Sequence, residues 1–165
     1  MKIDFLNNIH REPARNDIEF GLCDDQNGEK AYSDITDRSK WVATVQNKNA
    51  ISVVFTPVDN CLIENADLPC IGRCDGIVTT KKHLFFVEMK DKLADWMPHA
   101  KQQLEDTIKL FIKNHPNEFK GFRIKKAFVC NKAKTRFQTI MNEEQKQFYD
   151  TYKVRLHIEG NIVIK

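Results

Sequence analysis

Residues 74–90 read CDGIVTTKKHLFFVEMK, two runs rich in β-branched and aromatic residues around a polar centre. Such runs favour strands, because these side chains pack well on a pleated surface. We therefore predict strands over Arg73–Thr79 and Leu84–Lys90, with residues 80–83 as the loop between them. A loop this short joins antiparallel neighbours, so the two strands are expected to form a hairpin.

The second of these strands changes character at its end. Residues two apart in a strand share a face, so Glu88 and Lys90 point to the same side. The opposite side is apolar and consists of Phe85, Val87 and Met89. Charged side chains are seldom buried unless they are paired or bind a metal. The Glu-x-Lys end of this strand is therefore a candidate functional site.

The hairpin register brings a second carboxylate to that site. If Thr79 faces Leu84, then Asp75 faces Glu88, and the Cβ atoms of facing residues lie roughly 5 Å apart. Two carboxylates at that separation repel each other unless a hard cation such as Mg²⁺ or Mn²⁺ lies between them. Lys90 follows on the same face, where it could orient a water molecule or hold a phosphate oxygen.

A simpler interpretation is also open from the residues alone. Asp75 could mark a turn beside Gly76, while Glu88 and Lys90 form an exposed ion pair on an edge strand. The apolar run before Glu88, the facing Asp75 and the amphipathic helix that follows favour the functional interpretation.

This arrangement resembles the PD-(D/E)xK nuclease superfamily, which includes restriction endonucleases and Holliday-junction resolvases. Asp75 is followed after twelve residues by Glu88-Met89-Lys90, then by a helix and a strand, and the resemblance covers roughly residues 53–130. It implies a mixed sheet flanked by helices, with Asp75, Glu88 and the Met89 carbonyl as ligands of Mg²⁺ or Mn²⁺. The metal would lower the pKa of a bound water and neutralise charge on the phosphate, and Lys90 would assist that water.

Other positions of the superfamily pattern are less defined in this chain. Cys74 stands where the motif names Pro. Members often carry another acidic residue before the Asp strand, and the candidates are Glu12, Glu19, Glu29, Asp59 and Glu64. Some members use a polar residue from the helix after Glu-x-Lys. Gln103, which borders the apolar stripe of that helix, is the candidate, and a plain boundary position is the alternative.

Three helices are expected from apolar spacing. The longest would start with Asp95 as its N-cap, carry Pro98 in its first turn and end at His115-Pro116. Its apolar stripe consists of Met97, Ala100, Leu104, Ile108, Phe111 and Ile112. Another helix is expected from Asn142 to about Tyr152. A short one is expected within residues 1–17, with Ile3, Leu6 and Ile9 on one side.

Further strands complete an α+β fold with an α/β-like core. They are expected over Ile18–Cys23, Glu29–Ser33, Trp41–Gln46, Ile51–Pro57, Arg123–Cys130, Val154–Ile158 and Ile162–Ile164. The first two would form a hairpin around Asn27-Gly28, and the last two a hairpin around Gly160-Asn161. The expected architecture is a restriction-endonuclease-like central mixed sheet flanked by helices, with a β-rich N-terminal region.

The composition is that of an ordinary globular chain of 165 residues, with 41% apolar residues, 30% charged residues and a net charge of +3. That length suits a single domain, 1–165, with a β-rich portion of about 1–60 and a nuclease-like core of about 51–165. No stretch approaches a membrane span and no apolar signal segment is present, so we expect a cytoplasmic protein with no membrane partner. The five cysteines are odd in number, which favours reduced thiols.

These observations predict a metal-dependent nuclease that acts on nucleic acid, with DNA as the expected substrate. A row of basic residues could line a phosphate track beside the site, or could be a solvated face: Lys125, Lys126, Lys132, Lys134 and Arg136. The β-rich N-terminal portion would serve as a specificity element or as part of a homodimer interface. The alternative function is a catalytically inactive module of the same fold that binds nucleic acid or a protein partner.

Overall fold

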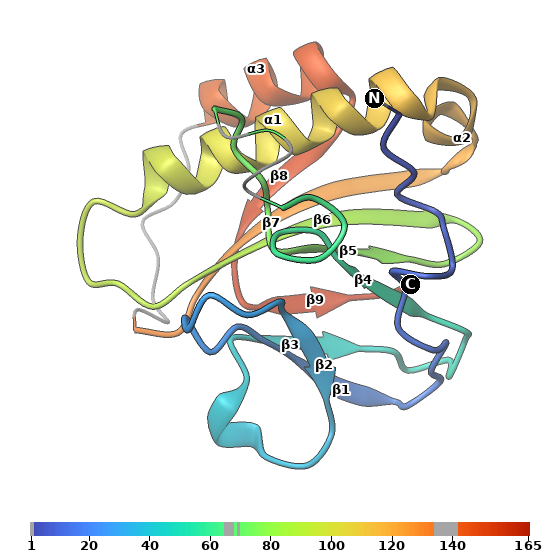
Figure 1. Cartoon of the computed structure of the whole chain (residues 1–165), viewed down its shortest axis with the longest axis vertical. Coiled ribbons are helices and arrows are strands. Elements are labelled where there is room, and N and C mark those ends of the chain that lie inside the picture. The colour runs from blue at the N-terminus through green and yellow to red at the C-terminus, as the bar shows by residue number, and fades with distance from the viewer. Residues whose placement is uncertain (1, 65–67, 69, 134–141) are drawn as a thin grey trace.

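The structure, a computed structural model, describes residues 2–64, 68, 70–133 and 142–165. Within these residues two mixed β-sheets and three α-helices form three layers, which confirms the predicted α+β class (Figure 1). The elements are β1 (Glu19–Cys23), β2 (Tyr32–Asp34), the 3₁₀ helix η1 (Arg38–Lys40), β3 (Ala43–Gln46), β4 (Val54–Pro57), β5 (Gly76–Thr79), β6 (His83–Lys90), α1 (Met97–Asn114), α2 (Pro116–Gly121), β7 (Ile124–Asn131), α3 (Asn142–Tyr152), β8 (Arg155–Ile158) and β9 (Asn161–Val163).

The predicted hairpin, β5–β6, lies at the centre of a five-stranded sheet with the order β4-β5-β6-β7-β8. β5 and β6 are antiparallel and Thr79 pairs with Leu84, so the predicted register is confirmed. β6 also pairs in parallel with β7. Because β6 has a neighbour on each side, the edge-strand interpretation of Glu88 and Lys90 is wrong. Their exposed fractions are 1% and 8%.

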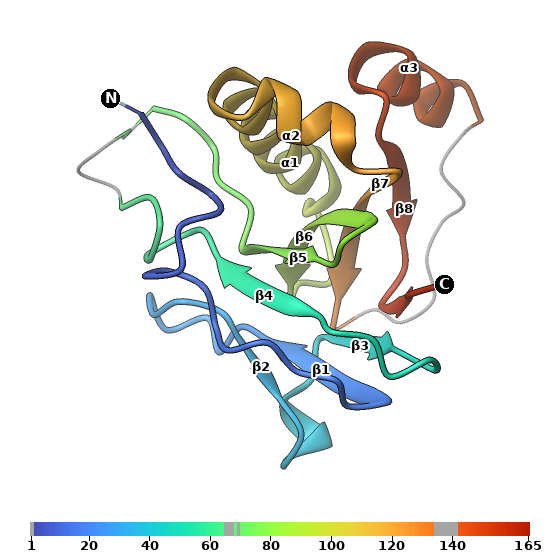
Figure 2. The ribbon, with the colours of Figure 1, turned by 90° about the vertical axis from the view of Figure 1, so that its right-hand side faces the viewer.

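The three α-helices cover one face of this sheet (Figure 2). The predicted stripe of α1 faces the sheet, with Ala100, Leu104, Ile108 and Phe111 buried. Phe111 meets Phe86 of β6 edge to face, with ring centroids 5.7 Å apart. This apolar contact positions α1 over β6, beside the charged end of that strand.

The start of α1 differs from the prediction. Trp96, and not Asp95, occupies the N-cap position, and no side chain caps the helix there. Asp95 adopts a left-handed backbone conformation with φ of 57°, which suits a turn residue. Trp96 is buried in the core between helices and sheet, so packing of the indole determines where the helix begins. At the other end His115 closes α1 as predicted, and the short helix α2 follows it, because Pro116 suits the first position of a helix.

A four-stranded sheet with the order β2-β1-β3-β9 covers the opposite face (Figure 2). The predicted β1–β2 hairpin is present, and Gly28 in its loop has a φ of 81°. Gly21 lets the indole of Trp41 pack on β1, since a Cβ there would lie 2.0 Å from the ring. The core between the two sheets includes Phe20, Leu22, Val45, Phe55, Phe85, Val87, Met89, Phe128 and Ile162.

The helix expected within residues 1–17 is absent from the described residues 2–17. Ile9, which the helical pattern would bury, is 82% exposed, whereas Phe5, off that stripe, is fully buried. The backbone instead follows β4: the N–H groups of Glu12 and Arg15 donate to carbonyl oxygens of that strand region at 2.9 and 2.8 Å. Pairing with β4 and burial of Phe5 thus outweigh the weak helical pattern.

The prediction of a hairpin at the C-terminus is also wrong. β8 pairs in parallel with β7, whereas β9 pairs in parallel with β3 in the other sheet. Leu156 of β8 packs in the core below the helices, and Ile162 of β9 packs in the core between the sheets. The chain therefore crosses from one sheet to the other around Gly160, whose carbonyl accepts from the N–H of Thr44 at 2.7 Å. No helix among the described residues is long and apolar enough to cross a membrane.

Candidate metal centre

Asp75 and Glu88 lie at the end of the β5–β6 hairpin. Paired residues end at Gly76 and Val87, so Asp75 and Glu88 occupy the next facing position. Both side chains are buried, with exposed fractions of 8% for Asp75 and 1% for Glu88. Asp75 Oδ2 accepts a hydrogen bond from the backbone N–H of Met89 at 2.6 Å. This bond fixes the Asp75 carboxyl across the end of β6, next to Glu88.

The segment that leads into Asp75 is attached to α1. The backbone N–H of Gly72 donates to Asp106 Oδ2, and that of Cys74 donates to Thr107 Oγ1, each at 2.8 Å. Proline has no backbone N–H, so it could not make the second of these bonds. The backbone N–H of Cys74 thus makes a contact to α1 that a proline at this position would exclude.

Lys90 connects β6 to α1 inside the site. Its Nζ lies 2.9 Å from Glu88 Oε1 and donates to Gln103 Oε1 at 2.7 Å. Gln103 Nε2 in turn donates to the carbonyl of Arg73 at 3.0 Å. The structure therefore brings together Glu88, Lys90 and Gln103, and Gln103 is partly buried at the border of the apolar stripe of α1.

Burial and like charge favour the protonated forms of both carboxyl groups. Burial raises the pKa of Glu88 to about 8, although the nearby Lys90 ammonium acts in the opposite direction. Burial, and then the negative charge of Glu88, raise the pKa of Asp75 well above its ordinary value. Hydrogen bonding from Met89 opposes this effect on Asp75. A divalent cation would stabilise the ionised forms that the apolar surroundings disfavour.

The donor set fits a hard cation. Glu88 Oε2 is buried and has no hydrogen-bond partner, and carboxylate oxygens are preferred ligands of Mg²⁺ and Mn²⁺. Among the described residues, no three His, Cys, Asp or Glu side chains form a ready-made metal-binding group. A cation held by Asp75 and Glu88 would therefore complete its shell with water and backbone carbonyl oxygen, of which the Met89 carbonyl is the predicted one.

Two more aspartates lie close to this pair. A cavity of about 180 Å³ is lined by Asp24, Gln26, Gly28, Glu29, Ala31, Asp59, Asn60 and Asp75. The negative charge of Asp24 contributes to raising the pKa of both Asp75 and Glu88. Asp59 Oδ1 lies 2.8 Å from Arg73 Nε. Asp24 belongs to the long loop between β1 and β2, and no sequence pattern indicates that this loop reaches the cavity beside Asp75.

The acidic residues proposed as an upstream ligand differ in their surroundings. Asp59 and Glu29 line the cavity that contains Asp75. Glu12 accepts hydrogen bonds from Ser33, and Glu19 pairs with Arg38, so both have other partners. Glu64 is exposed. Asp59 and Glu29 are therefore the candidates that the structure places in one cavity with Asp75, and of these Asp59 is paired with Arg73.

The predicted basic track is wrong for two of its members. Lys125 and Lys126 pair with Leu84 and Phe85, at the opposite end of β6 from Glu88 and Lys90. Lys132 does follow β7 near the site, and its backbone N–H donates to the carbonyl of Lys90 at 2.8 Å. Lys134 and Arg136 lie outside the described residues.

The described cysteines are free thiols, as predicted. Cys74 is fully buried, and burial raises the pKa of its thiol. Cys70 is exposed and so lies in a different environment from Cys74.

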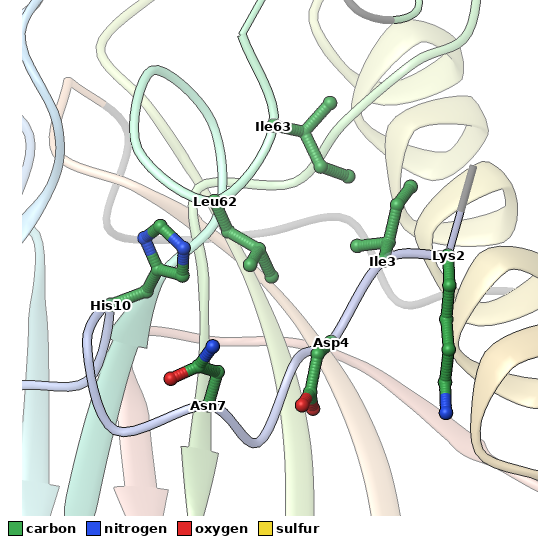
Figure 3. Close-up of a pocket in the computed structure, with 7 residues that line it drawn as sticks. All are labelled: Lys2, Ile3, Asp4, Asn7, His10, Leu62 and Ile63. Carbon is green, nitrogen blue, oxygen red and sulfur yellow. The ribbon is translucent and has the colours of Figure 1, made fainter.

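A cavity near the N-terminus is a weaker candidate for a functional site. It has a volume of about 180 Å³ and is lined by Lys2, Ile3, Asp4, Asn7, His10, Leu62 and Ile63. Figure 3 shows that Lys2 and Asp4 extend away from His10, so the polar groups do not converge on one point. The lining includes no pair of buried carboxylates, unlike the centre at Asp75 and Glu88.

Comparisons with protein families, with characterised proteins and with solved structures found no match to this chain.

Proposed function

We propose that the protein is a Mg²⁺- or Mn²⁺-dependent nuclease that hydrolyses phosphodiester bonds of nucleic acid, with DNA as the expected substrate. One observation carries the proposal: two buried carboxyl groups, Asp75 and Glu88, face each other at the end of paired strands with Lys90 held beside them. Burying two facing carboxyl groups beside a single ammonium destabilises a fold, and a catalytic cation gives a reason for their presence.

The residues would divide the chemistry between them. Asp75, Glu88 and the Met89 carbonyl would hold the cation, which supplies a water of lowered pKa and positive charge for the phosphate. Glu88 would give up its proton to hold the cation, since a protonated carboxyl is a poor ligand. Lys90 would then leave Glu88 Oε1 and direct its ammonium toward the attacking water or a phosphate oxygen. Gln103, already bonded to Lys90 Nζ, would keep that ammonium within reach.

A second candidate function follows from the same ion pair. Lys90 neutralises Glu88 without a cation, at a distance of 2.9 Å, and such a pair could be purely structural. The protein would then be a non-catalytic module that uses the same fold to bind nucleic acid or a protein partner.

A cleavage assay separates the two candidates. Plasmid, single-stranded DNA and RNA are incubated with the wild type and with Glu88→Gln in Mg²⁺ or Mn²⁺. Glu143→Gln, an exposed change on α3, serves as the matched control. The nuclease proposal expects cleavage by the wild type and the control, and loss of cleavage in Glu88→Gln and in EDTA. It is overturned if no substrate is cut, or if Glu88→Gln cuts as well as the wild type.

A further inference from the structure

A second charged cavity lies at the other end of the five-stranded sheet. It has a volume of about 420 Å³ and is lined by Arg123, Ile124, Lys125, Lys126, Tyr149, Lys153 and Arg155. We call it the basic pocket. Its lining includes five cationic side chains and no carboxylate. The pocket is separate from the candidate metal centre: from Lys126 to Asn131, which pairs with Lys90, β7 extends about 17 Å at the rise of a strand.

Three elements bring these cations together. Lys126 of β7 pairs directly with Arg155 of β8, a facing position at which like charges repel. Lys153 follows the end of α3 with a left-handed φ of 60°, and its N–H donates to the carbonyl of Tyr149 at 2.7 Å. The Tyr149 ring lies 5.6 Å from Lys153 Nζ and 5.9 Å from Arg155 Cζ. The fold thus gathers charges from the start of β7, the start of β8 and the end of α3.

The positive charge of the basic pocket is poorly compensated. Among the described residues, none of its five cations lies within 4.0 Å of an Asp or Glu oxygen. Burial lowers the pKa of Lys125 and of Lys126, and for Lys126 the positive charge of Arg155 adds to this effect, while Glu159 opposes it. An anion bound here would relieve repulsion that the fold itself creates.

We propose that the basic pocket binds the phosphate groups of a small phosphorylated ligand of the nucleotide class. Phosphate oxygens match Lys and Arg donors, and Arg can bind them through two parallel hydrogen bonds. The volume lies within the range of small-molecule sites. Tyr149, the aromatic residue of the lining, is 42% exposed and offers a surface on which a base can stack.

The test is calorimetric titration of the full chain with pyrophosphate and with ATP, in EDTA so that no cation occupies Asp75 and Glu88. Arg155→Glu and Lys153→Glu change exposed residues, so both variants are expected to fold. Lys40→Glu, an exposed change on η1, is the matched control. We expect both ligands to bind the wild type and the control, and each pocket variant to weaken binding at least about tenfold, as for loss of a charge-assisted hydrogen bond.

Several results would overturn the proposal. One is the absence of binding by either ligand at low salt, and another is binding that Arg155→Glu leaves unchanged. A third is a single-stranded DNA oligonucleotide that binds in an Arg155-dependent way while pyrophosphate and ATP do not. That last result would assign the basic pocket to a nucleic-acid surface. Because the titration contains no metal and measures no cleavage, its outcome is independent of the nuclease proposal.

Discussion

Lys90 Nζ lies 2.9 Å from Oε1 of Glu88, the residue two positions earlier on the same face of β6. The pair is almost fully enclosed, and Glu88 Oε2 on its other side has no partner. A divalent cation that binds Glu88 must therefore compete with a proton and with the Lys90 ammonium. This competition leads to measurable consequences for metal binding, for stability and for catalysis.

Asp75→Asn is expected to abolish tight cation binding and to leave the fold intact. Asparagine keeps an oxygen that can accept from the Met89 N–H, but it removes the charge that would attract the metal. In the wild type, Mn²⁺ at a hundred times its Kd should raise Tm by about 5–10 °C, because it binds the folded state alone. The variant should show almost no shift in the same thermal melt.

Asp150→Asn, an exposed change on α3, is the control for that experiment. It should keep the full Mn²⁺-dependent shift. If Asp75→Asn also keeps the shift, Asp75 is not a ligand and the assignment of the metal centre is wrong.

Mg²⁺ affinity is expected to rise with pH between about 6 and 8. The pKa of Glu88 is raised to about 8 by burial, so below that pH the cation must displace a proton. Release of one proton gives up to about a tenfold gain in affinity for each pH unit, and the gain ends above the pKa. Calorimetry in two buffers of different ionisation enthalpy would count the protons released. An affinity that is constant over this range would contradict the raised pKa.

The stability of the metal-free protein should fall as pH rises from about 4.5 to 8. In the folded protein the pKa of Glu88 is raised from 4.5 to about 8, so in this window the folded state holds the proton that the unfolded state releases. The contribution of this bound proton to the free energy of unfolding is fully present below pH 4.5 and is lost as the pH rises through 8. We expect a loss of a few kcal/mol in the free energy of unfolding, and the opposing effect of Lys90 is already part of the raised pKa.

Glu88→Gln removes that titration and should give a flatter dependence of stability on pH. Gln103 still accepts from Lys90 in this variant, so the comparison concerns the slope and not the absolute value. Urea denaturation in EDTA at pH 5, 6.5 and 8 provides the measurement. Equal slopes in the two proteins would mean that Glu88 ionises normally. Asp75, whose pKa is also raised by burial, contributes in the same direction in both.

The centre of the fold could be predicted because its signals are local. The β5–β6 hairpin needs a short polar loop and two apolar runs, and its register then fixes which residues face each other. Gln103 could be found because helical geometry alone puts it at the border of the stripe of α1. The proximity of Asp24 to Asp75 could not be predicted, since it depends on how the long β1–β2 loop lies beside the segment that leads into β5.

The elements that were predicted incorrectly show where tertiary packing outweighs the local sequence pattern. Residues around Gly160 carry a good turn signal, but Leu156 and Ile162 are each buried in a different core, so their strands separate into two sheets. Asp95 is a good capping residue, but burial of Trp96 moves the helix start past it. In both cases burial of apolar side chains outweighs the local turn or capping signal.

Lys90→Ala should separate catalysis from metal binding. Lys90 is not a predicted ligand, and it neutralises the Glu88 carboxylate that a cation would use. Loss of the ammonium removes a competitor for Glu88 but also favours the protonated form of that carboxyl. Because these effects oppose each other, the variant should bind Mn²⁺ at pH 8.5 with an affinity close to that of the wild type. Removal of one preorganised donor from the site should lower the cleavage rate by about 10²–10³-fold.

Lys92→Ala, an exposed change just past β6, should alter neither the Mn²⁺ affinity nor the cleavage rate. Loss of Mn²⁺ binding or of the folded state in Lys90→Ala would show that the lysine is structural. Normal cleavage would show that the Glu88-x-Lys90 pair has no catalytic role, and would leave the non-catalytic module as the better account.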